Sequence, residues 1–135
     1  MTLQFSLTAA PASQPRNIVI GQILSLVIAQ GIGQAKHIDL WFKQTIATSL
    51  AIGLMAKVGV THPPAGAAAL FFSGGTSSWA QLILMLMGNV IAIECATLIN
   101  NWSDKRQYPT FWGLRPIHDI LFDNGEQRDK IQKNE

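Results

Sequence analysis

The stretch Trp-Ala-Gln-Leu-Ile-Leu-Met-Leu-Met-Gly-Asn-Val-Ile-Ala-Ile-Glu-Cys-Ala-Thr-Leu-Ile-Asn, residues 79–100, decides the class of fold. Glu94 is its only formal charge. A helix that crosses the hydrocarbon core of a bilayer needs about 20 predominantly apolar residues, and this stretch supplies them. We therefore expect a transmembrane helix here, with a lipid bilayer around it.

Two further segments have the length and composition of transmembrane helices. The first runs from Pro15 to Gly33, and the second runs from about Gln44 to Val60, preceded by Trp41-Phe42-Lys43 at the membrane interface. Only 13% of all residues are charged, about half the usual share of a soluble domain. Because helices on a soluble surface need charged outer faces, the sequence predicts an all-α, polytopic membrane helix bundle.

A shorter apolar segment, from about Pro64 to Phe72, separates the last two spans. It is roughly half a membrane thickness long, so it cannot cross fully. We expect a re-entrant half-helix that carries the His62-Pro63-Pro64 motif, with residues 73–78 returning the chain to the same side. The predicted architecture is three transmembrane helices plus this half-helix.

The basic residues of the short loops predict the orientation and the domain limits. Arg16 and the connection 61–78 share one side under this topology, and the more basic side should be cytoplasmic. That basic side carries Lys36, Lys43, Lys105, Arg106 and Arg115. The expected divisions are a short N-terminal lead (1–13), a transmembrane domain (14–101) and a polar cytoplasmic or stromal tail (102–135) with Tyr108, Phe111 and Trp112 as interfacial aromatics.

The His62-Pro63-Pro64 turn is the most informative candidate for a binding site. Proline fixes its own φ and disfavours helical geometry in the residue before it, so a helix can begin only near Pro64. A helix N-terminus presents free N–H groups and a partial positive charge, which hold anions, and Gly66 allows close approach to the backbone. The alternative is a proline-stiffened loop whose histidine faces water.

Lys57 lies one turn before Val60, close to the end of the second span. Its ammonium group either snorkels to the interface or joins His62 and Arg16 around a basic vestibule, which would concentrate anions.

Four polar residues of the third span fall on one arc at about 100° per residue. They are Asn89, Glu94, Thr97 and Asn100. A carboxylate inside a membrane must be neutral, face a wet cavity or meet a cation. We expect a protein-facing polar stripe, which either lines a pathway or bonds helices together.

The sequence gives no indication of catalysis. It lacks a nucleophile elbow, a phosphate loop, metal-spaced His/Glu pairs and paired carboxylates. The single cysteine, Cys95, cannot build a disulfide framework or a zinc site, and no basic cluster interleaved with aromatics indicates nucleic acid. We expect a non-enzyme without cofactor, metal site or nucleic-acid partner.

Three stretches resemble the HPP family of integral membrane proteins, which is named for its His-Pro-Pro motif. They are Gln14-Pro15-Arg16-Asn17-Ile18-Val19-Ile20-Gly21, Thr61-His62-Pro63-Pro64-Ala65-Gly66-Ala67-Ala68-Ala69-Leu70, and Asn100-Asn101 through Lys105-Arg106-Gln107-Tyr108-Pro109. The resemblance extends over residues 5–112. It implies transport, because plant and cyanobacterial members are associated with nitrite movement across plastid or cell membranes.

On this resemblance we expect a transporter or channel for a small inorganic anion, with nitrite as the family-level substrate. The expected location is the plasma membrane or the plastid inner envelope. The alternative is a non-transporting membrane scaffold or a subunit of a larger complex. The expected substrate-binding residues are His62, Pro63, Pro64, Ala65, Gly66, Lys57, Arg16 and Asn17.

Two departures from the family pattern have consequences. Many members carry histidine where this chain has Gln22, which removes a candidate proton relay. The family usually has an apolar span upstream of the Gln-Pro-Arg-Asn element, and the residues before it here, 1–13, are too few to cross a membrane. We therefore expect a fragment, or a chain that completes its bundle as a homo-oligomer or with a partner subunit.

Overall fold

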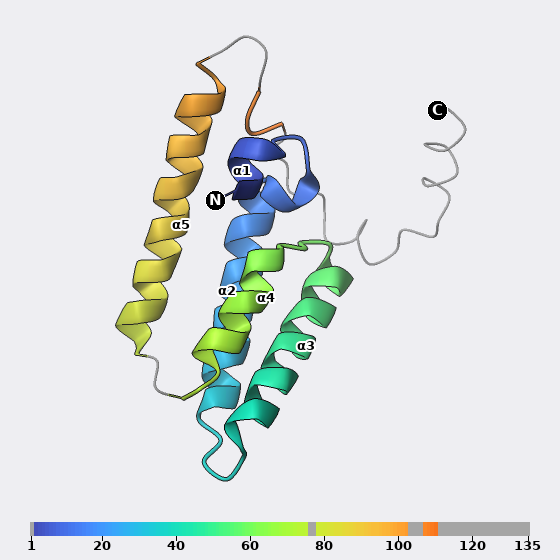
Figure 1. The fold of residues 1–135 in the computed structure, drawn as a ribbon, viewed down its shortest axis with the longest axis vertical. Helices are drawn as coiled ribbons and strands as arrows, with labels where there is room; N and C mark the ends of the chain where they lie inside the picture. Colours follow the sequence, from blue (N-terminus) through green and yellow to red (C-terminus); the bar gives the residue numbers. More distant parts are fainter. Residues whose placement is uncertain (1, 76–77, 103–106, 111–135) are drawn as a thin grey trace, which may run out of the picture.

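The structure is a computed structural model that describes residues 2–75, 78–102 and 107–110. In these ranges the regular elements are all helical, which confirms the predicted all-α class. Figure 1 shows them in chain order. They are α1 (Thr2–Ser6), the 3-10 helix η1 (Pro11–Ser13), α2 (Pro15–Gly33), α3 (Leu40–Val58), α4 (Pro63–Phe72) and α5 (Trp79–Asn100).

The predicted bounds of α2 and α5 agree with the structure, and in the structure both helices begin at strong local signals. Pro15 is the first residue of α2, where its missing N–H costs no hydrogen bond. Ser78 caps α5 in a capping box with Gln81. Helix α3 begins at Leu40 rather than near Gln44, because the Asp39 carbonyl accepts the N–H groups of the first turn.

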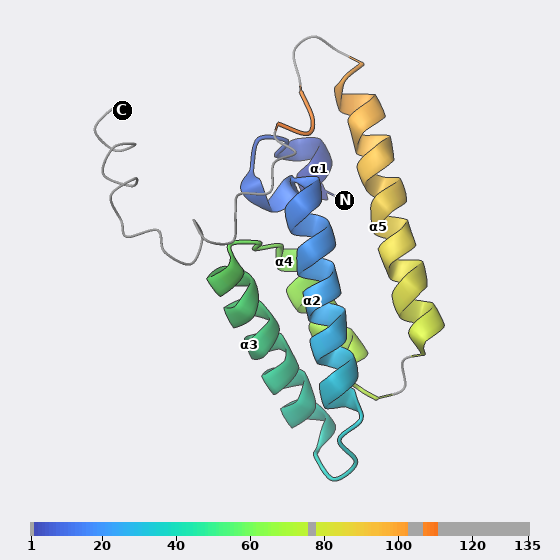
Figure 2. The same ribbon diagram turned by 180° about the vertical axis from the view of Figure 1, so that it is seen from behind.

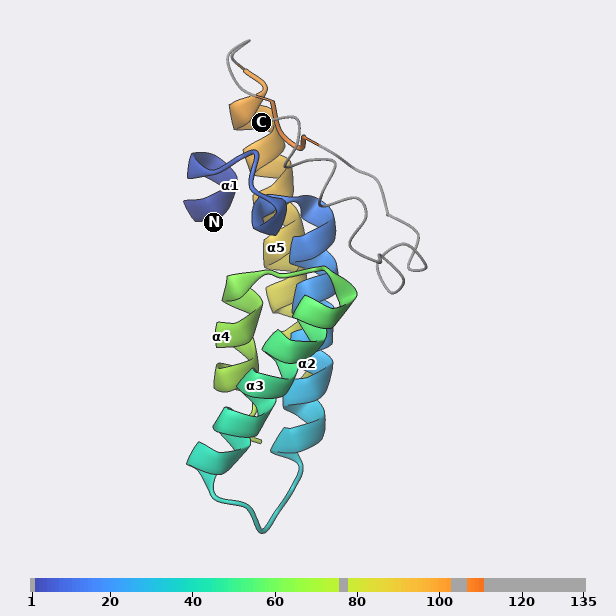
Figure 3. The same cartoon turned by 90° about the vertical axis from the view of Figure 1, so that its right-hand side faces the viewer.

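Helices α2, α3 and α4 pack against one another, whereas α5 packs mainly on α2. Figures 1 and 2 show α3 and α5 on opposite sides of the α2–α4 pair, and Figure 3 shows the same bundle from the side. The core between α3 and α4 consists of Ala51, Met55, Val60, Ala65 and Ala69. The core that joins α2, α4 and α5 consists of Leu26, Ala29, Ala68, Phe72 and Leu82.

Helix α4 runs alongside the second half of α2 without turning back, so the predicted re-entrant return of the chain is not confirmed. Its first turn lies by Gly21 of α2, where a Cβ would come within 3.1 Å of the His62 Cβ. The segment after it packs on the far end of α2, where a Cβ on Gly33 would lie 3.1 Å from the Gly75 nitrogen. We call these the turn end (Ala12–Pro15, His62 and Tyr108) and the glycine end (Gly33, Gly74 and Gly75).

Because α4 does not return, α5 runs in the opposite direction to the one predicted. It starts at the glycine end and finishes at the turn end, where Asn100 Nδ2 donates to the Gln4 carbonyl over 3.1 Å. Tyr108 lies at this end too, fully buried rather than in an interfacial belt. The other predicted interfacial and tail residues, Lys105, Arg106, Phe111, Trp112 and Arg115, lie outside the described residues.

Within the described ranges, two helices are both long and apolar enough to cross a membrane, namely α2 and α5. The third predicted span, α3, has 19 residues but is not among them. Its polar residues lower its hydropathy, and Lys43 and Lys57 add two charges.

Candidate functional site

His62 occupies a buried position at the turn between α3 and α4. It is the N-cap of α4, with the extended backbone that a following proline favours. Its side chain is 5% exposed, and Nδ1 lies 2.8 Å from the Ala12 carbonyl oxygen. Since a carbonyl only accepts, Nδ1 must carry the proton in this contact. Burial lowers the pKa of His62, so the ring is neutral near pH 7 and Nε2 is an acceptor.

Gly21 allows the turn to pack directly on α2. A Cβ at this position would lie 3.1 Å from both the His62 Cβ and the Val60 carbonyl oxygen, and 3.2 Å from Met55 Sδ. These distances are shorter than an ordinary van der Waals contact. The first and second stretches that the sequence singled out therefore meet at this point.

The third stretch joins them through Tyr108 and Asn101. The Tyr108 hydroxyl donates to the Ser13 carbonyl over 2.7 Å. The Asn101 amide pairs with the Tyr108 backbone, donating to its carbonyl over 2.7 Å and accepting from its N–H over 2.9 Å. Gln14 Oε1 accepts the N–H of Thr110 over 3.1 Å. All three stretches thus converge at the turn end, and sequence reasoning missed the structural role of Tyr108.

The predicted basic vestibule forms only in part. Arg16 is half-buried at the turn end, and its Nε is buried without a hydrogen-bond partner among the described residues. Asn17 follows it and is buried. Lys57 is exposed near the C-terminal end of α3, so the structure does not bring it into the buried cluster around His62.

The first turn of α4 offers fewer free amides than the sequence suggested. Pro63 and Pro64 have no N–H, and the Ala65 N–H donates to the His62 carbonyl over 2.9 Å. Gly66 is buried, and a Cβ there would lie 3.3 Å from the Ile52 side chain. Gly66 therefore allows close approach of α3, which is a packing role.

Two buried polar residues of α2, Gln22 and Ser25, were not singled out as site residues. The Gln22 Nε2 has the weak acceptor Met85 Sδ at 3.4 Å. The Ser25 Oγ is fully buried and has no partner in the described part of the chain. Their spacing of three places them on one face of an apolar helix, which is the signal that could have identified them.

The polar residues of α5 divide between two sides of the helix. Asn100 is buried and Asn89 and Thr97 are half-buried, and each donates a hydrogen bond to a carbonyl of its own helix. Glu94 is exposed. Of the predicted protein-facing stripe, this chain covers Asn100 and part of Asn89 and Thr97, whereas Glu94 lies outside the arc of α5 that the described residues cover.

Comparisons with known proteins cover all three of these stretches. The model of the HPP transmembrane region matches residues 1–109. One transmembrane protein of Dictyostelium discoideum is 33% identical over 116 residues, which cover 80% of this chain and 41% of that protein. Another from the same organism is 31% identical over 118 residues, covering 82% of this chain and 38% of that protein. No solved structure matches.

The chain thus spans well under half the length of these two relatives. The family match nevertheless covers every element described above, from α1 to the residues that follow α5. The chain belongs to the HPP family of membrane proteins.

Proposed function

We propose that this chain passes a small inorganic anion, with nitrite as the family-level substrate, across a plasma membrane or plastid inner envelope. The observation that carries the proposal is the Arg16 Nε, a buried cationic donor without an acceptor among the described residues. A buried donor left unpaired costs roughly 1–3 kcal/mol, and more when it is charged. A small anion with exposed oxygens would supply the missing acceptor.

Further polar groups lie deeper along α2, on the face that packs into the bundle. Gln22 and Ser25 lie closer to the glycine end than Arg16 and about 120° and 180° around the helix from it, and neither has a strong hydrogen-bond partner among the described residues. An amide and a hydroxyl can both donate to an anion that has lost part of its hydration shell. We assign them to the inner part of the path.

The motif residues fix the structure of the turn end, where the proposed path begins at Arg16. His62 fastens the α3–α4 turn to Ala12, and Asn17 lies buried in the first turn of α2. Pro63, Pro64, Ala65 and Gly66 fix the start of α4. Lys57 contributes positive potential from the outer face rather than a direct contact. The proposal assigns no chemical reaction to the chain.

A scaffold or subunit role is the second candidate, and it is favoured by the outer face of α5. Glu94 is exposed there among large apolar side chains, and a carboxylate facing lipid is costly. A second copy or a partner helix would cover it. This candidate requires no flux.

The test is nitrite flux into proteoliposomes that contain the whole chain. We expect Arg16→Gln to slow the flux about tenfold, because a hydrogen bond to a charged group contributes about 1.5–3 kcal/mol. Ser25→Ala should slow it less, and His62→Ala should slow it by loosening the turn. Gly31→Ala is the matched control, since a Cβ there meets nothing within 4 Å. Wild-type flux equal to that of empty vesicles would support the scaffold role instead.

A further inference from the structure

The glycine end contains a pocket that the proposed transport path does not use. Its volume is about 370 Å³. It lies where α2 ends and where the chain leaves α4, at the opposite end of the bundle from His62. The lining residues are Gly33, Gln34, Ala35, Lys36, Lys43, Gly74 and Gly75.

Lys43 gives this pocket a fixed positive charge. Its side chain is only 9% exposed, and Nζ donates to the Gly33 carbonyl over 3.2 Å. A cation is favourable beside the C-terminal carbonyls of a helix, which explains how the ammonium group is held. An ammonium group has three N–H donors, so this contact leaves donors to a bound group. Lys36, in the loop after α2, adds a second and exposed cation to the lining.

Glycine backbone forms another part of the wall. Gly74 and Gly75 have no side chains to fill the space, and Gly75 has a φ of 81°, in the left-handed region. The loop between α2 and α3 also contains Asp39, but this residue is exposed and does not line the pocket. Among the residues that the structure describes, the lining therefore has two cations and no anion, which selects for a negatively charged group.

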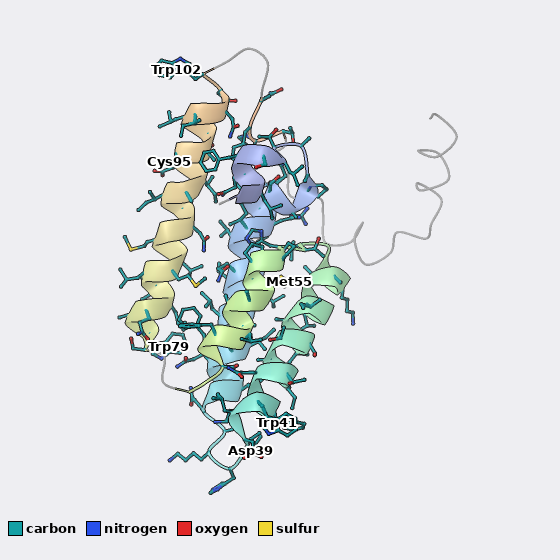
Figure 4. All side chains as sticks on the ribbon, viewed as in Figure 1. Asp39, Trp41, Met55, Trp79, Cys95 and Trp102 are labelled. Atoms are coloured by element: carbon teal, nitrogen blue, oxygen red, sulfur yellow. The ribbon has the colours of Figure 1, made fainter. Side chains whose placement is uncertain are left out.

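Exposed tryptophans indicate the depth of the pocket relative to the bilayer. Trp41 is 65% exposed in the first turn of α3, and Trp79 is 61% exposed at the start of α5. Figure 4 shows both toward the end of the bundle that carries Asp39, away from Trp102. Exposed tryptophans gather at the level of lipid headgroups, and basic pockets between helices at this level bind anionic headgroups.

We propose that this pocket binds the phosphate of an anionic phospholipid headgroup, held between Lys36 and Lys43. The shared chemistry is a phosphate oxyanion, and the lipid is the expected source because the flanking tryptophans place the pocket at headgroup depth. The proposal is independent of the anion path, since it concerns the opposite end of the bundle.

The whole chain is extracted from vesicles that contain phosphatidylcholine and phosphatidylglycerol in equal amounts. Native mass spectrometry then measures which lipids the chain retains. Wild type should retain phosphatidylglycerol selectively. Lys36→Gln, at an exposed loop position that tolerates change, should reduce that selectivity about fivefold. Lys43→Arg should keep it, and Lys43→Gln should lose it. Lys57→Gln removes one charge from an exposed site at the other end of α3 and should leave the phosphatidylglycerol selectivity unchanged.

A second arm distinguishes the source of the phosphate. Inorganic phosphate added to the chain in pure phosphatidylcholine should not raise its thermal stability. Phosphatidylglycerol added to the same lipid should raise it. Protection by inorganic phosphate alone, to the same extent as by phosphatidylglycerol, would overturn the lipid assignment. Equal phosphatidylglycerol retention by wild type and Lys36→Gln would overturn the site itself.

Discussion

The turn end and the glycine end of the bundle are held together by different means. At the turn end, side chains bind backbone groups, as in the contacts from His62 to Ala12 and from Tyr108 to Ser13. At the glycine end, two backbones touch directly, because Gly33 and Gly75 have no side chains between them. Side-chain contacts can be weakened one at a time, whereas a close backbone contact does not tolerate even a methyl group. The turn end has such a contact as well, at Gly21, and the Lys43 side chain adds a hydrogen bond at the glycine end. The difference is therefore one of degree, and the glycine end should be the more sensitive to an added methyl group.

Gly75→Ala should have the largest effect. Its Cβ would lie 2.5 Å from the Gly33 carbonyl oxygen, and its φ of 81° is strained for alanine. Overpacking and left-handed strain together should destabilise the fold by about 3 kcal/mol or more. The free energy of unfolding in mixed micelles checks this. A loss no larger than that of Gly31→Ala, whose Cβ meets nothing within 4 Å, would show that the two backbones are not in contact.

Gly21→Ala should come second, and it probes the turn end. Its Cβ would lie 3.1 Å from the Val60 carbonyl oxygen and the His62 Cβ, so the turn must move away from α2. We expect a loss of about 2 kcal/mol. Gly53→Ala is the matched control, since its Cβ meets nothing within 4 Å and alanine favours a helix by about 1 kcal/mol. A stabilising effect of Gly21→Ala would contradict the packing of the turn on α2.

Tyr108→Phe should have a smaller effect. It removes the hydroxyl that donates to Ser13 and leaves the buried ring in place. A single hydrogen bond of this kind contributes about 1 kcal/mol to stability. The same unfolding measurement applies, and Gln107→Ala is the control because that neighbouring side chain is exposed. An unchanged free energy would show that the third stretch is not fastened to the first.

The smallest expected effect is a dependence of stability on pH. Burial lowers the pKa of His62 below its ordinary value of 6.5, so the unfolded chain takes up a proton before the folded chain does. Stability should be unaffected by this group above pH 6.5 and should fall as the pH drops from 6.5 through the folded pKa. His62→Gln should remove that part of the slope. A variant with the full wild-type slope would show that another group is responsible.

The sequence was sufficient for the features that depend on local signals. Pro15 marked the start of α2, the long apolar run from Trp79 marked α5, and the His-Pro-Pro motif identified the family. The course of the chain after α4 was not accessible, because a helix of 10 residues does not show at which end of the bundle the next helix begins. The Gly33–Gly75 contact between distant residues decides it.

The sequence likewise could not show which face of α5 is buried. Helical periodicity gives the angle between Asn89 and Glu94, but it does not say which arc the rest of the chain covers. That arc depends on the positions of α1 and α2, against which α5 packs, and it leaves Asn100 buried and Glu94 exposed. Tyr108 was placed at the interface because an aromatic after a span usually lies there. Its hydrogen bond to Ser13 joins residues far apart in the chain.

The chain does not turn back after α4, so α5 begins at the glycine end and finishes at the turn end. The convergence of the three stretches rests on this claim. Its most direct test uses single cysteines in a Cys95→Ser background, placed by Ala9→Cys, Lys36→Cys and Trp102→Cys, all exposed positions. In sealed, uniformly oriented vesicles, a membrane-impermeant maleimide should label positions 9 and 102 from the same side and position 36 from the other. Labelling of position 102 together with position 36 would show that α4 returns to the side where it began, and the arrangement described here would be wrong.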